Sequence, residues 1–258
     1  MSKIRLDQLL VQRGLCETRA KAQARILAGD VLVGDRPVTK AGTAVDEAAE
    51  IRLRGEGLPF VSRGGLKLQG ALDLWKPDVA GRVCFDAGAS TGGFTDCLLQ
   101  RGASKVYAVD VGTNQLHWKL RSDIRVVSIE QTNLRTWDAA SIPERCSFLC
   151  ADLSFISLKL AIPPVLASLT DDADAVLLVK PQFEAGRGEV GEGGIVRDPL
   201  IHARVCTDIW RFFEDTVLKP QALAPSPIRG GEGNVEFLLR LKMGGQIGDL
   251  RAALDGLG

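Results

Sequence analysis

A glycine-rich turn between an apolar segment and a helical segment constrains the fold of this chain more than any other feature. Residues 83–87 have the composition of a buried strand, and residues 88–93 lead into a helix that we predict over 94–101. A strand, a glycine-rich turn and a helix in this order let a ligand approach the backbone closely. The segment therefore predicts a βα unit of a parallel sheet with a nucleotide-type cofactor at its turn.

Further apolar segments alternate with helical patterns after this turn, which favours an α/β fold. Because strands that alternate with helices form parallel sheets covered by those helices, we expect helices on both faces of the sheet. The expected strands after the turn are residues 105–109, 125–129, 147–151, 175–179 and 235–241.

The residues around the turn indicate what charge its cofactor carries. We expect Asp86 at the lip of the turn, where a carboxylate would repel a pyrophosphate but suit a cofactor with a cationic part, such as the sulfonium of S-adenosylmethionine. Asp110 ends the next strand, about twenty residues past the loop, where an acid can hold both ribose hydroxyls. The chain lacks the GxxxxGK[ST] pattern, which disfavours a P-loop ATPase or kinase.

Polar residues follow the later strands, where ligands bind in open α/β sheets. Asn133 could contact the adenine, and a helix N-cap explains it equally well. Lys180 follows an apolar strand, and because a buried lone ammonium is unfavourable it needs a partner. Asp152, at the end of the neighbouring strand, is the natural partner. A lysine that simply reaches solvent is the structural alternative.

Basic residues are concentrated near the N-terminus, although the chain has 32 basic and 32 acidic residues and no net charge. Residues 1–30 hold six basic residues against three acidic ones. Two predicted helices and short strands over residues 1–55 would carry these charges, either to a nucleic acid or as an ordinary solvated face. The candidates for RNA contact are Arg5, Arg19, Lys21, Arg25 and, beside the linker, Arg63.

A stretch rich in glycine and proline over residues 56–66 is the best linker candidate. We expect a small N-terminal domain over residues 1–57, a linker over 58–64 and a catalytic domain over 65–258.

Two motif sets resemble known families. The pattern that begins Arg5-Leu6-Asp7 and ends Val31-x-Val33 closely resembles the small RNA-binding fold named after ribosomal protein S-four. Over essentially the whole chain, the motifs resemble the TlyA, or hemolysin A-like, ribosomal RNA methyltransferases, whose catalytic domain is similar to FtsJ-type ribose methyltransferases. The segments that carry this second resemblance are residues 86–95, 151–157, 179–184 and 233–236.

The resemblance implies a Rossmann-like methyltransferase with a mostly parallel seven-stranded sheet and a small N-terminal α+β RNA-binding domain. It implies transfer of a methyl group from S-adenosylmethionine to the ribose 2′-hydroxyl of a cytidine in ribosomal RNA. The implied catalytic tetrad is Lys67, Asp152, Lys180 and Glu236. The residues expected to contact the cofactor are Asp86, Gly88, Ala89, Ser90, Gly92, Gly93, Phe94, Asp110, Asn133 and Asp152.

The tetrad residues suit this chemistry because a ribose hydroxyl is a poor nucleophile that must lose its proton or have its oxyanion stabilised. We expect Lys180 to contact the 2′-oxygen as a base or as a cation, Asp152 and Glu236 to orient Lys180, and Lys67 to position the ribose. No metal is required. One departure from the family is Leu58-Pro59-Phe60-Val61 at the linker, which leaves the coupling of the two domains open.

Three alternatives remain at this point: a membrane-active hemolysin, an RNA-binding ribosome assembly factor without catalysis, and a base methyltransferase. The chain has no amphipathic pore segment, and residues 152–155 are not the Asn-Pro-Pro-aromatic run typical of many base methyltransferases. Six cysteines without a CxxC pair and a charged N-terminus favour a reduced, cytoplasmic protein. We expect a monomer whose partner is ribosomal RNA or a ribosomal subunit, with no membrane association.

Overall fold

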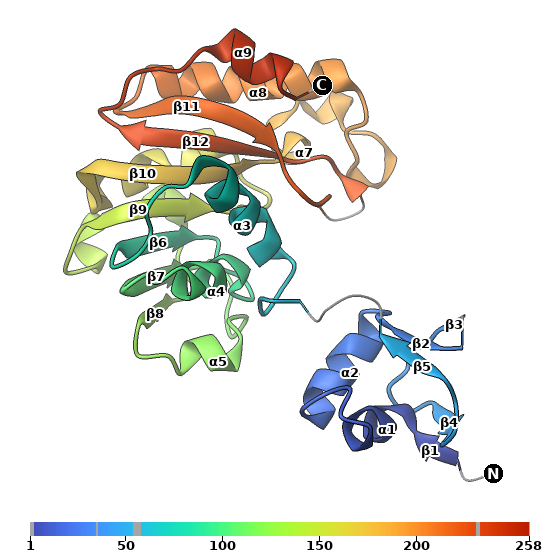
Figure 1. The fold of residues 1–258 in the computed structure, drawn as a ribbon. Helices are drawn as coiled ribbons and strands as arrows, with labels where there is room; N and C mark the ends of the chain where they lie inside the picture. The colour runs from blue at the N-terminus through green and yellow to red at the C-terminus, as the bar shows by residue number, and fades with distance from the viewer. Residues whose placement is uncertain (1–2, 35, 54–57, 231–232, 258) are drawn as a thin grey trace. The chain divides into compact units, whose positions relative to one another are not determined.

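The computed structural model describes residues 3–34, 36–53, 58–230 and 233–257. It divides the chain into two compact units, Met1–Pro59 and Phe60–Gly258 (Figure 1).

The first unit is a small α+β fold, as the sequence predicts. Its helices pack a shared apolar face that includes Leu6, Leu10 and Ile26. Thr18 caps the second helix, because its side-chain oxygen accepts a hydrogen bond from the Lys21 backbone N–H. The elements in chain order are β1 (Lys3–Arg5), α1 (Leu6–Gln12), α2 (Arg19–Leu27), β2 (Val31–Val33), β3 (Arg36–Pro37), β4 (Ala44–Asp46) and β5 (Ile51–Leu53).

These short strands form two small sheets. Strand β1 pairs with β4, and β2 lies between β3 and β5; all of these pairs are antiparallel. The sequence predicts short strands at residues 31–33 and 51–53, which are β2 and β5. It does not predict β4, because the three residues of β4 carry too little apolar pattern.

The second unit alternates strands and helices. Its helices are α3 (Gly64–Trp75), α4 (Gly93–Gln100), α5 (Trp118–Arg121), α6 (Leu158–Ala161), α7 (Pro181–Glu184), α8 (Pro199–Glu214) and α9 (Leu250–Asp255). Its strands are β6 (Val83–Ala87), β7 (Lys105–Val109), β8 (Val126–Ile129), β9 (Cys146–Ala151), β10 (Leu169–Val179), β11 (Leu218–Pro225) and β12 (Phe237–Met243).

These strands form one seven-stranded sheet in the order β11-β12-β10-β9-β6-β7-β8. The pairs from β10 through β8 are parallel, whereas β12 is antiparallel to both of its neighbours. The predicted mostly parallel seven-stranded sheet is confirmed. Strand β10 begins six residues earlier than expected, because its first half contains Asp171, Asp172 and Asp174 and does not read as apolar.

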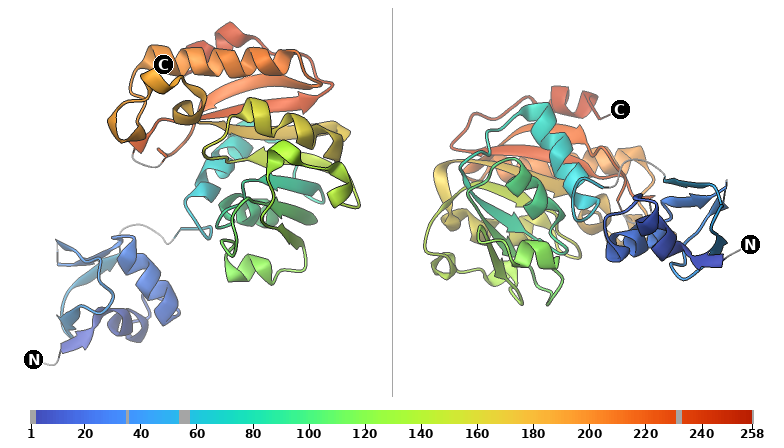
Figure 2. Two further views of the ribbon diagram at one scale, coloured as in Figure 1. Left: turned by 180° about the vertical axis from the view of Figure 1, so that it is seen from behind. Right: turned by 60° about the horizontal axis from the view of Figure 1, so that its bottom comes forward.

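Helices cover both faces of the sheet, which explains the continuous apolar runs of the central strands. On one face, Leu177 and Leu149 pack with Trp210 and Phe213 of α8. On the other, Val176 contributes to a second core with residues of α3 and α4, including Leu68 and Leu98. The two helix layers can be followed in Figures 1 and 2.

The start of the second unit is partly fixed by packing within the expected linker. Phe60 is buried, and a Cβ on Gly65 would lie 2.4 Å from its ring. The Val61 backbone N–H donates a 2.8 Å hydrogen bond to Asp96 of α4. These contacts anchor residues 60 and 61 to the helix layer that carries α3.

Candidate functional site

Four charged side chains form an alternating row at the carboxyl end of the parallel strands. Glu236 Oε2 lies 2.6 Å from Lys67 Nζ, Lys67 Nζ lies 3.7 Å from Asp152 Oδ2, and Asp152 Oδ1 lies 2.6 Å from Lys180 Nζ. The structure therefore brings together all four residues of the expected tetrad.

The sheet topology explains this convergence from distant parts of the sequence. Asp152 and Lys180 directly follow the adjacent parallel strands β9 and β10, so they leave the sheet at the same edge. Glu236 precedes β12, which runs antiparallel to β10 and therefore starts at that edge. Helix α3 carries Lys67 across the end of these strands.

Three of the four side chains in the row are buried, and that of Asp152 is 19% exposed. Lys67 and Lys180 are each 8% exposed and Glu236 is 2% exposed. Two lysines and two carboxylates balance in charge, which makes their shared burial tolerable where a single charge would not be. One expectation is corrected here: Glu236 contacts Lys67, not Lys180, because the row places Asp152 between the two lysines.

Lys180, at the end of the row, has a different environment from Lys67. Its ammonium contacts one carboxylate, that of Asp152, and donates a 3.1 Å hydrogen bond to the Ser154 hydroxyl. An ammonium has three N–H bonds. Within the part of the chain that the structure describes, Asp152 and Ser154 account for two of them. Ser154 was not singled out from the sequence, although it lies in the motif at residues 151–157.

Phe155 is a second residue of this motif that sequence reasoning left without a role. Its side chain is 91% exposed, and its φ of +65° lies in the left-handed region that bulky residues avoid. Its ring lies 5.0 Å from that of Phe183, and the Lys180 ammonium lies 5.7 Å from the centre of the Phe183 ring. An exposed aromatic ring is thus held beside the charged row.

Glu184 fastens the two loops that carry Asp152 and Lys180. Its carboxylate accepts hydrogen bonds from the Ser157 hydroxyl at 2.6 Å and from the Leu158 backbone N–H at 2.7 Å. Burial raises the pKa of Glu184, and these hydrogen bonds oppose the rise. The hydrogen bonds of Glu184 therefore hold the motif at residues 179–184 against the motif at residues 151–157.

Asn234 and Gly230 hold the Glu236 end of the row. The Asn234 side chain bonds to the Val196 N–H and the Gly194 carbonyl, both at 3.1 Å. A Cβ on Gly230 would lie 2.1 Å from Glu236 Oε1, so only glycine leaves room for the carboxylate.

A cleft of about 330 Å³ lies beside the charged row, at the ends of β6, β7 and β9. Ser154 and Phe155 line one side, and Val109 with Leu153 supply apolar surface. Of the expected cofactor residues, the cleft is lined by Gly88, Asp110 and Asn133.

Asp110 is fixed at the cleft by backbone hydrogen bonds. Its carboxylate accepts from the Ser90 N–H at 2.8 Å and from the Gly112 N–H at 2.7 Å. The carboxylate therefore links the glycine-rich loop to the end of β7. Asn133 caps the short helix after β8 through the Arg135 N–H and also lines the cleft, so its contact with the adenine stays a prediction.

The other loop residues shape the turn. Gly88 has a φ of +81°, and a Cβ there would lie 2.8 Å from the Asp152 carbonyl oxygen. Ser90 is exposed, and Ala89 is buried. Gly92 leaves room for Leu120. Gly93 and Phe94 pack toward the α3 layer and are not among the residues that line the cleft.

Asp86 does not lie where the sequence suggested. Its side chain is fully buried, so the expected position at an open lip is wrong. Asp86 accepts a 2.6 Å hydrogen bond from the Thr95 hydroxyl and contacts the Cys150 thiol at 3.6 Å. Burial raises the pKa of Asp86 to about 7. Asp86 therefore ties β6 to α4 and β9 behind the loop.

The expected RNA-contacting residues of the first unit are already engaged in side-chain contacts. Arg5 and Arg19 both pair with Asp7, and Lys21 pairs with Glu17 one turn away. Arg25 is half-buried on the same helix as Lys21. In the second unit, Arg63 is exposed directly before α3.

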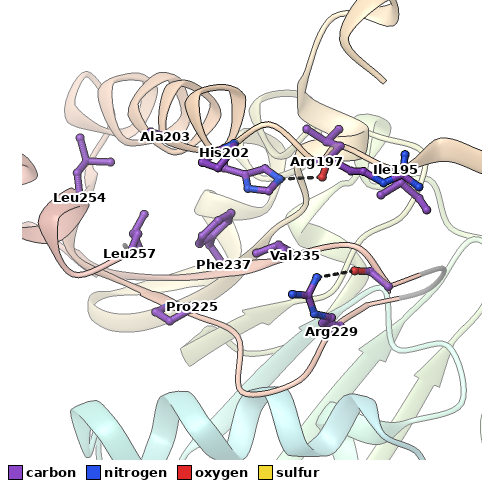
Figure 3. Close-up of a pocket in the computed structure, with 13 residues that line it drawn as sticks. Ile195, Arg197, His202, Ala203, Pro225, Arg229, Val235, Phe237, Leu254 and Leu257 are labelled. Carbon is purple, nitrogen blue, oxygen red and sulfur yellow. Dashed lines mark hydrogen bonds between the residues drawn. The ribbon is translucent and has the colours of Figure 1, made fainter. Parts of the chain in front are cut away.

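A larger cavity of about 870 Å³ lies between α8, α9 and the ends of β11 and β12 (Figure 3). His202 of α8 bonds to the Val196 carbonyl at its wall, and Arg229 donates to the Gly233 carbonyl. None of the residues expected for catalysis or cofactor binding lines this cavity.

Among the described residues, no group of three or more histidine, cysteine, aspartate or glutamate side chains could hold a metal ion. None of the helices described has both the length and the apolar composition needed to cross a membrane.

Family models match both units of the chain. The FtsJ-like methyltransferase model matches residues 60–243, and the S4 domain model matches residues 4–51. The chain belongs to the FtsJ-like methyltransferase family. This FtsJ-like methyltransferase thus combines an S4 domain with a catalytic domain, as its motifs predict.

Relatives over nearly the full length agree with this assignment. YqxC of Bacillus subtilis, named as an rRNA methyltransferase, is 48% identical over 95% of this chain and 87% of its own. The 16S/23S rRNA (cytidine-2′-O)-methyltransferase TlyA of Mycobacterium tuberculosis is 45% identical over 93% of this chain and 90% of its own. A solved structure from Streptococcus thermophilus, which carries the name hemolysin, is 44% identical with a TM-score of 0.77, and covers 99% of this chain and 95% of its own.

Proposed function

We propose that this chain transfers a methyl group from S-adenosylmethionine to the ribose 2′-hydroxyl of a cytidine in ribosomal RNA. The observation that carries the proposal is the alternating row Glu236, Lys67, Asp152 and Lys180 beside a cleft at the glycine-rich loop. TlyA, which is named for this activity, is a relative over nearly the full length. The intact row favours catalysis over an assembly factor that only binds RNA.

The cleft fits the methyl donor by its chemistry. Asp110 offers a fixed carboxylate to ribose hydroxyls, and Val109 and Leu153 offer apolar surface to an adenine. Gly88 and Asn133 complete the wall. The donor, when bound, supplies a methyl group on a positively charged sulfur. No metal takes part in the proposal.

Lys180 acts on the 2′-oxygen from the side of its nitrogen that Asp152 and Ser154 leave available. The 2′-hydroxyl must lose its proton as the new O–C bond forms. Either a neutral Lys180 amine accepts this proton on its lone pair, or the Lys180 ammonium donates a hydrogen bond to the developing oxyanion while water takes the proton. Lys67, held by Glu236, positions the ribose. Because the remaining requirement is in-line approach, the rigid row contributes mainly by orientation.

Phe155 offers a surface for the target base. An exposed ring that is held in a strained backbone conformation points to a role outside folding. Stacking of a nucleobase on an aromatic ring is favourable for any base and would hold the ribose near Lys180.

In this proposal, residues 1–57 bind RNA, residues 58–64 join the two parts and residues 65–258 carry out the transfer. Arg5, Arg19, Lys21, Arg25 and Arg63 contact the RNA backbone. The protein works as a monomer in the cytoplasm, where its substrate occurs and where its six free cysteines stay reduced.

The test is methyl transfer to small and large ribosomal subunits purified from a strain that lacks this modification, with a labelled donor. Lys180→Ala should lower kcat by at least about 100-fold, the scale of a lost acid–base or oxyanion contact. Lys180→Arg separates the two roles, because arginine keeps the cation but does not accept a proton.

Lys105→Ala is the matched control, since Lys105 pairs with Glu144 at the opposite end of the sheet and should leave the rate unchanged. All three variants should bind the methyl donor with wild-type affinity in calorimetry. Transfer by Lys180→Ala at the wild-type rate would contradict the proposal.

A further inference from the structure

Asp7 is a fully buried acid on α1 that three side chains surround with hydrogen-bond donors. Arg5 donates to both carboxylate oxygens at 3.1 Å, through Nε and Nη2. Arg19 Nε and Gln23 Nε2 each donate to Oδ2 at 2.9 Å. The hydrogen bond from Arg5, with those from Gln23 and Arg19, lowers the pKa of Asp7 far below its ordinary value, although burial opposes this. The Asp7 carboxylate is therefore negatively charged at neutral pH, where RNA binding is measured.

The two arginines keep much of their surface while they are tied to this carboxylate. The side chain of Arg5 is 46% exposed and that of Arg19 is 51% exposed, whereas that of Asp7 is fully covered. A guanidinium has five N–H bonds; Arg5 uses two of them on Asp7 and Arg19 uses one. The remaining N–H groups of the two arginines can donate to an RNA phosphate. Because Asp7 is buried, that phosphate does not contact its carboxylate.

Arg5 is also confined from a second direction. A Cβ on Gly42 would lie only 3.0 Å from Arg5 Nη1, so the turn at residues 41–43 packs against the guanidinium. The Leu6 and Asp7 backbone N–H groups bond to the Thr43 and Ala41 carbonyls, which fixes this turn against α1.

We propose that Asp7 is a positioning residue that holds Arg5 and Arg19 as one preorganised pair of guanidinium groups for RNA phosphates. This inference rests on the proposed function. Immobilising a long side chain on binding costs free energy, and a side chain that is already ordered in the free protein avoids that cost. Planar guanidinium forks also match phosphate oxygens best when their orientation is set. An acid within a basic surface thus strengthens binding.

Two variants that each remove one negative charge distinguish the positioning role of Asp7 from a general effect of net charge on RNA binding. Asp7→Asn and Glu47→Gln change the net charge equally, and Glu47 is an exposed residue of the same unit whose carboxylate has no partner among the described residues. Bulk charge alone predicts that both variants bind RNA more tightly. We expect Glu47→Gln to bind unmodified ribosomal subunits at least as tightly as wild type, and Asp7→Asn to bind about tenfold more weakly.

The salt dependence of RNA binding distinguishes a loss of phosphate contacts from a loss of order in the arginines that make them. With both arginines present, Asp7→Asn should keep the wild-type slope of log K against log salt concentration, whereas Arg5→Gln combined with Arg19→Gln should flatten it. Adding Asp7→Asn to that double variant should cause no further loss. In methyl transfer, Asp7→Asn should raise KM for the subunit and leave kcat at saturation unchanged.

Folding of the first unit is followed through Cys16, which is buried in its core. If Asp7→Asn makes Cys16 reactive toward thiol reagents, Arg19→Lys replaces it in the test, because lysine keeps the charge but not the fork. Arg19→Lys should then bind a few-fold more weakly with an unchanged salt slope. Binding by a folded Asp7→Asn as tight as by Glu47→Gln, or by Arg19→Lys as tight as by wild type, overturns the inference. Failure of the proposed function would appear separately, as absence of methyl transfer by wild type.

Discussion

Replacement of Asp86 by asparagine should change how the stability of the catalytic unit depends on pH. Asp86 is fully buried and touches Thr95 and Cys150. Burial is the main cause that raises its pKa to about 7, from 3.8 for an ordinary aspartate. Asparagine has nearly the same shape and can bond to the same hydroxyl, but it has no charge to bury.

The sign and size of the effect follow from these two pKa values. Because the folded state holds the proton more tightly, the stabilising contribution of Asp86 is complete below pH 3.8 and is lost as the pH rises through about 7. The difference between the two pKa values corresponds to roughly 4 kcal/mol of unfolding free energy. About 3 kcal/mol of this is lost between pH 5 and pH 8. Asp86→Asn should lack this loss, so its advantage over wild type should grow with pH.

Urea unfolding followed by tryptophan fluorescence measures this effect in the full chain. All four tryptophans, Trp75, Trp118, Trp137 and Trp210, lie in the second unit, so the signal reports that unit alone. The difference in unfolding free energy between Asp86→Asn and wild type should rise by about 3 kcal/mol from pH 5 to pH 8. Parallel pH profiles, or a difference that shrinks as the pH rises, would show that Asp86 does not hold its proton more tightly in the folded state.

Three further predictions concern the site. Ser154→Ala removes a partner of Lys180 and should lower kcat, measured at saturating donor, about tenfold; an unchanged kcat would show that Ser154 does not hold Lys180 for catalysis. Gly88→Ala places a Cβ 2.8 Å from a backbone oxygen and should abolish donor binding, whereas Gly81→Ala, at a similar φ but with open space around it, should bind normally. Phe155→Ala should raise KM for the ribosomal subunit several-fold with little change in thermal stability, and an unchanged KM would argue against base stacking.

The sequence predicted the catalytic sheet well because its central strands are buried on both faces. A strand of this kind reads as an uninterrupted apolar run, and the expected strand at residues 83–87 coincides with β6. The charged N-terminal half of β10 was missed, because polar residues at the amino end of a strand carry no such signal. Helix α8 and strand β11 received no prediction, although both belong to the larger core.

The sequence predicted which residues form the site, but not all of the contacts between them. Lys180 and Asp152 follow adjacent strands, so their pairing was visible from topology. The contact between Glu236 and Lys67 joins residues that are far apart in sequence, and no local pattern could say which lysine the acid meets. Asp86 was misplaced because a strand residue next to a turn can point into the core as readily as toward a ligand.

The chemical identity of the methylated nucleoside decides between ribose and base methylation. Ribosomal subunits that lack the modification are incubated with the protein and a labelled methyl donor, and the RNA is digested to nucleosides for mass spectrometry. We expect the label in 2′-O-methylcytidine with wild type and no label with Lys180→Ala. Label on a cytosine base, or equal label with Lys180→Ala, would contradict this expectation.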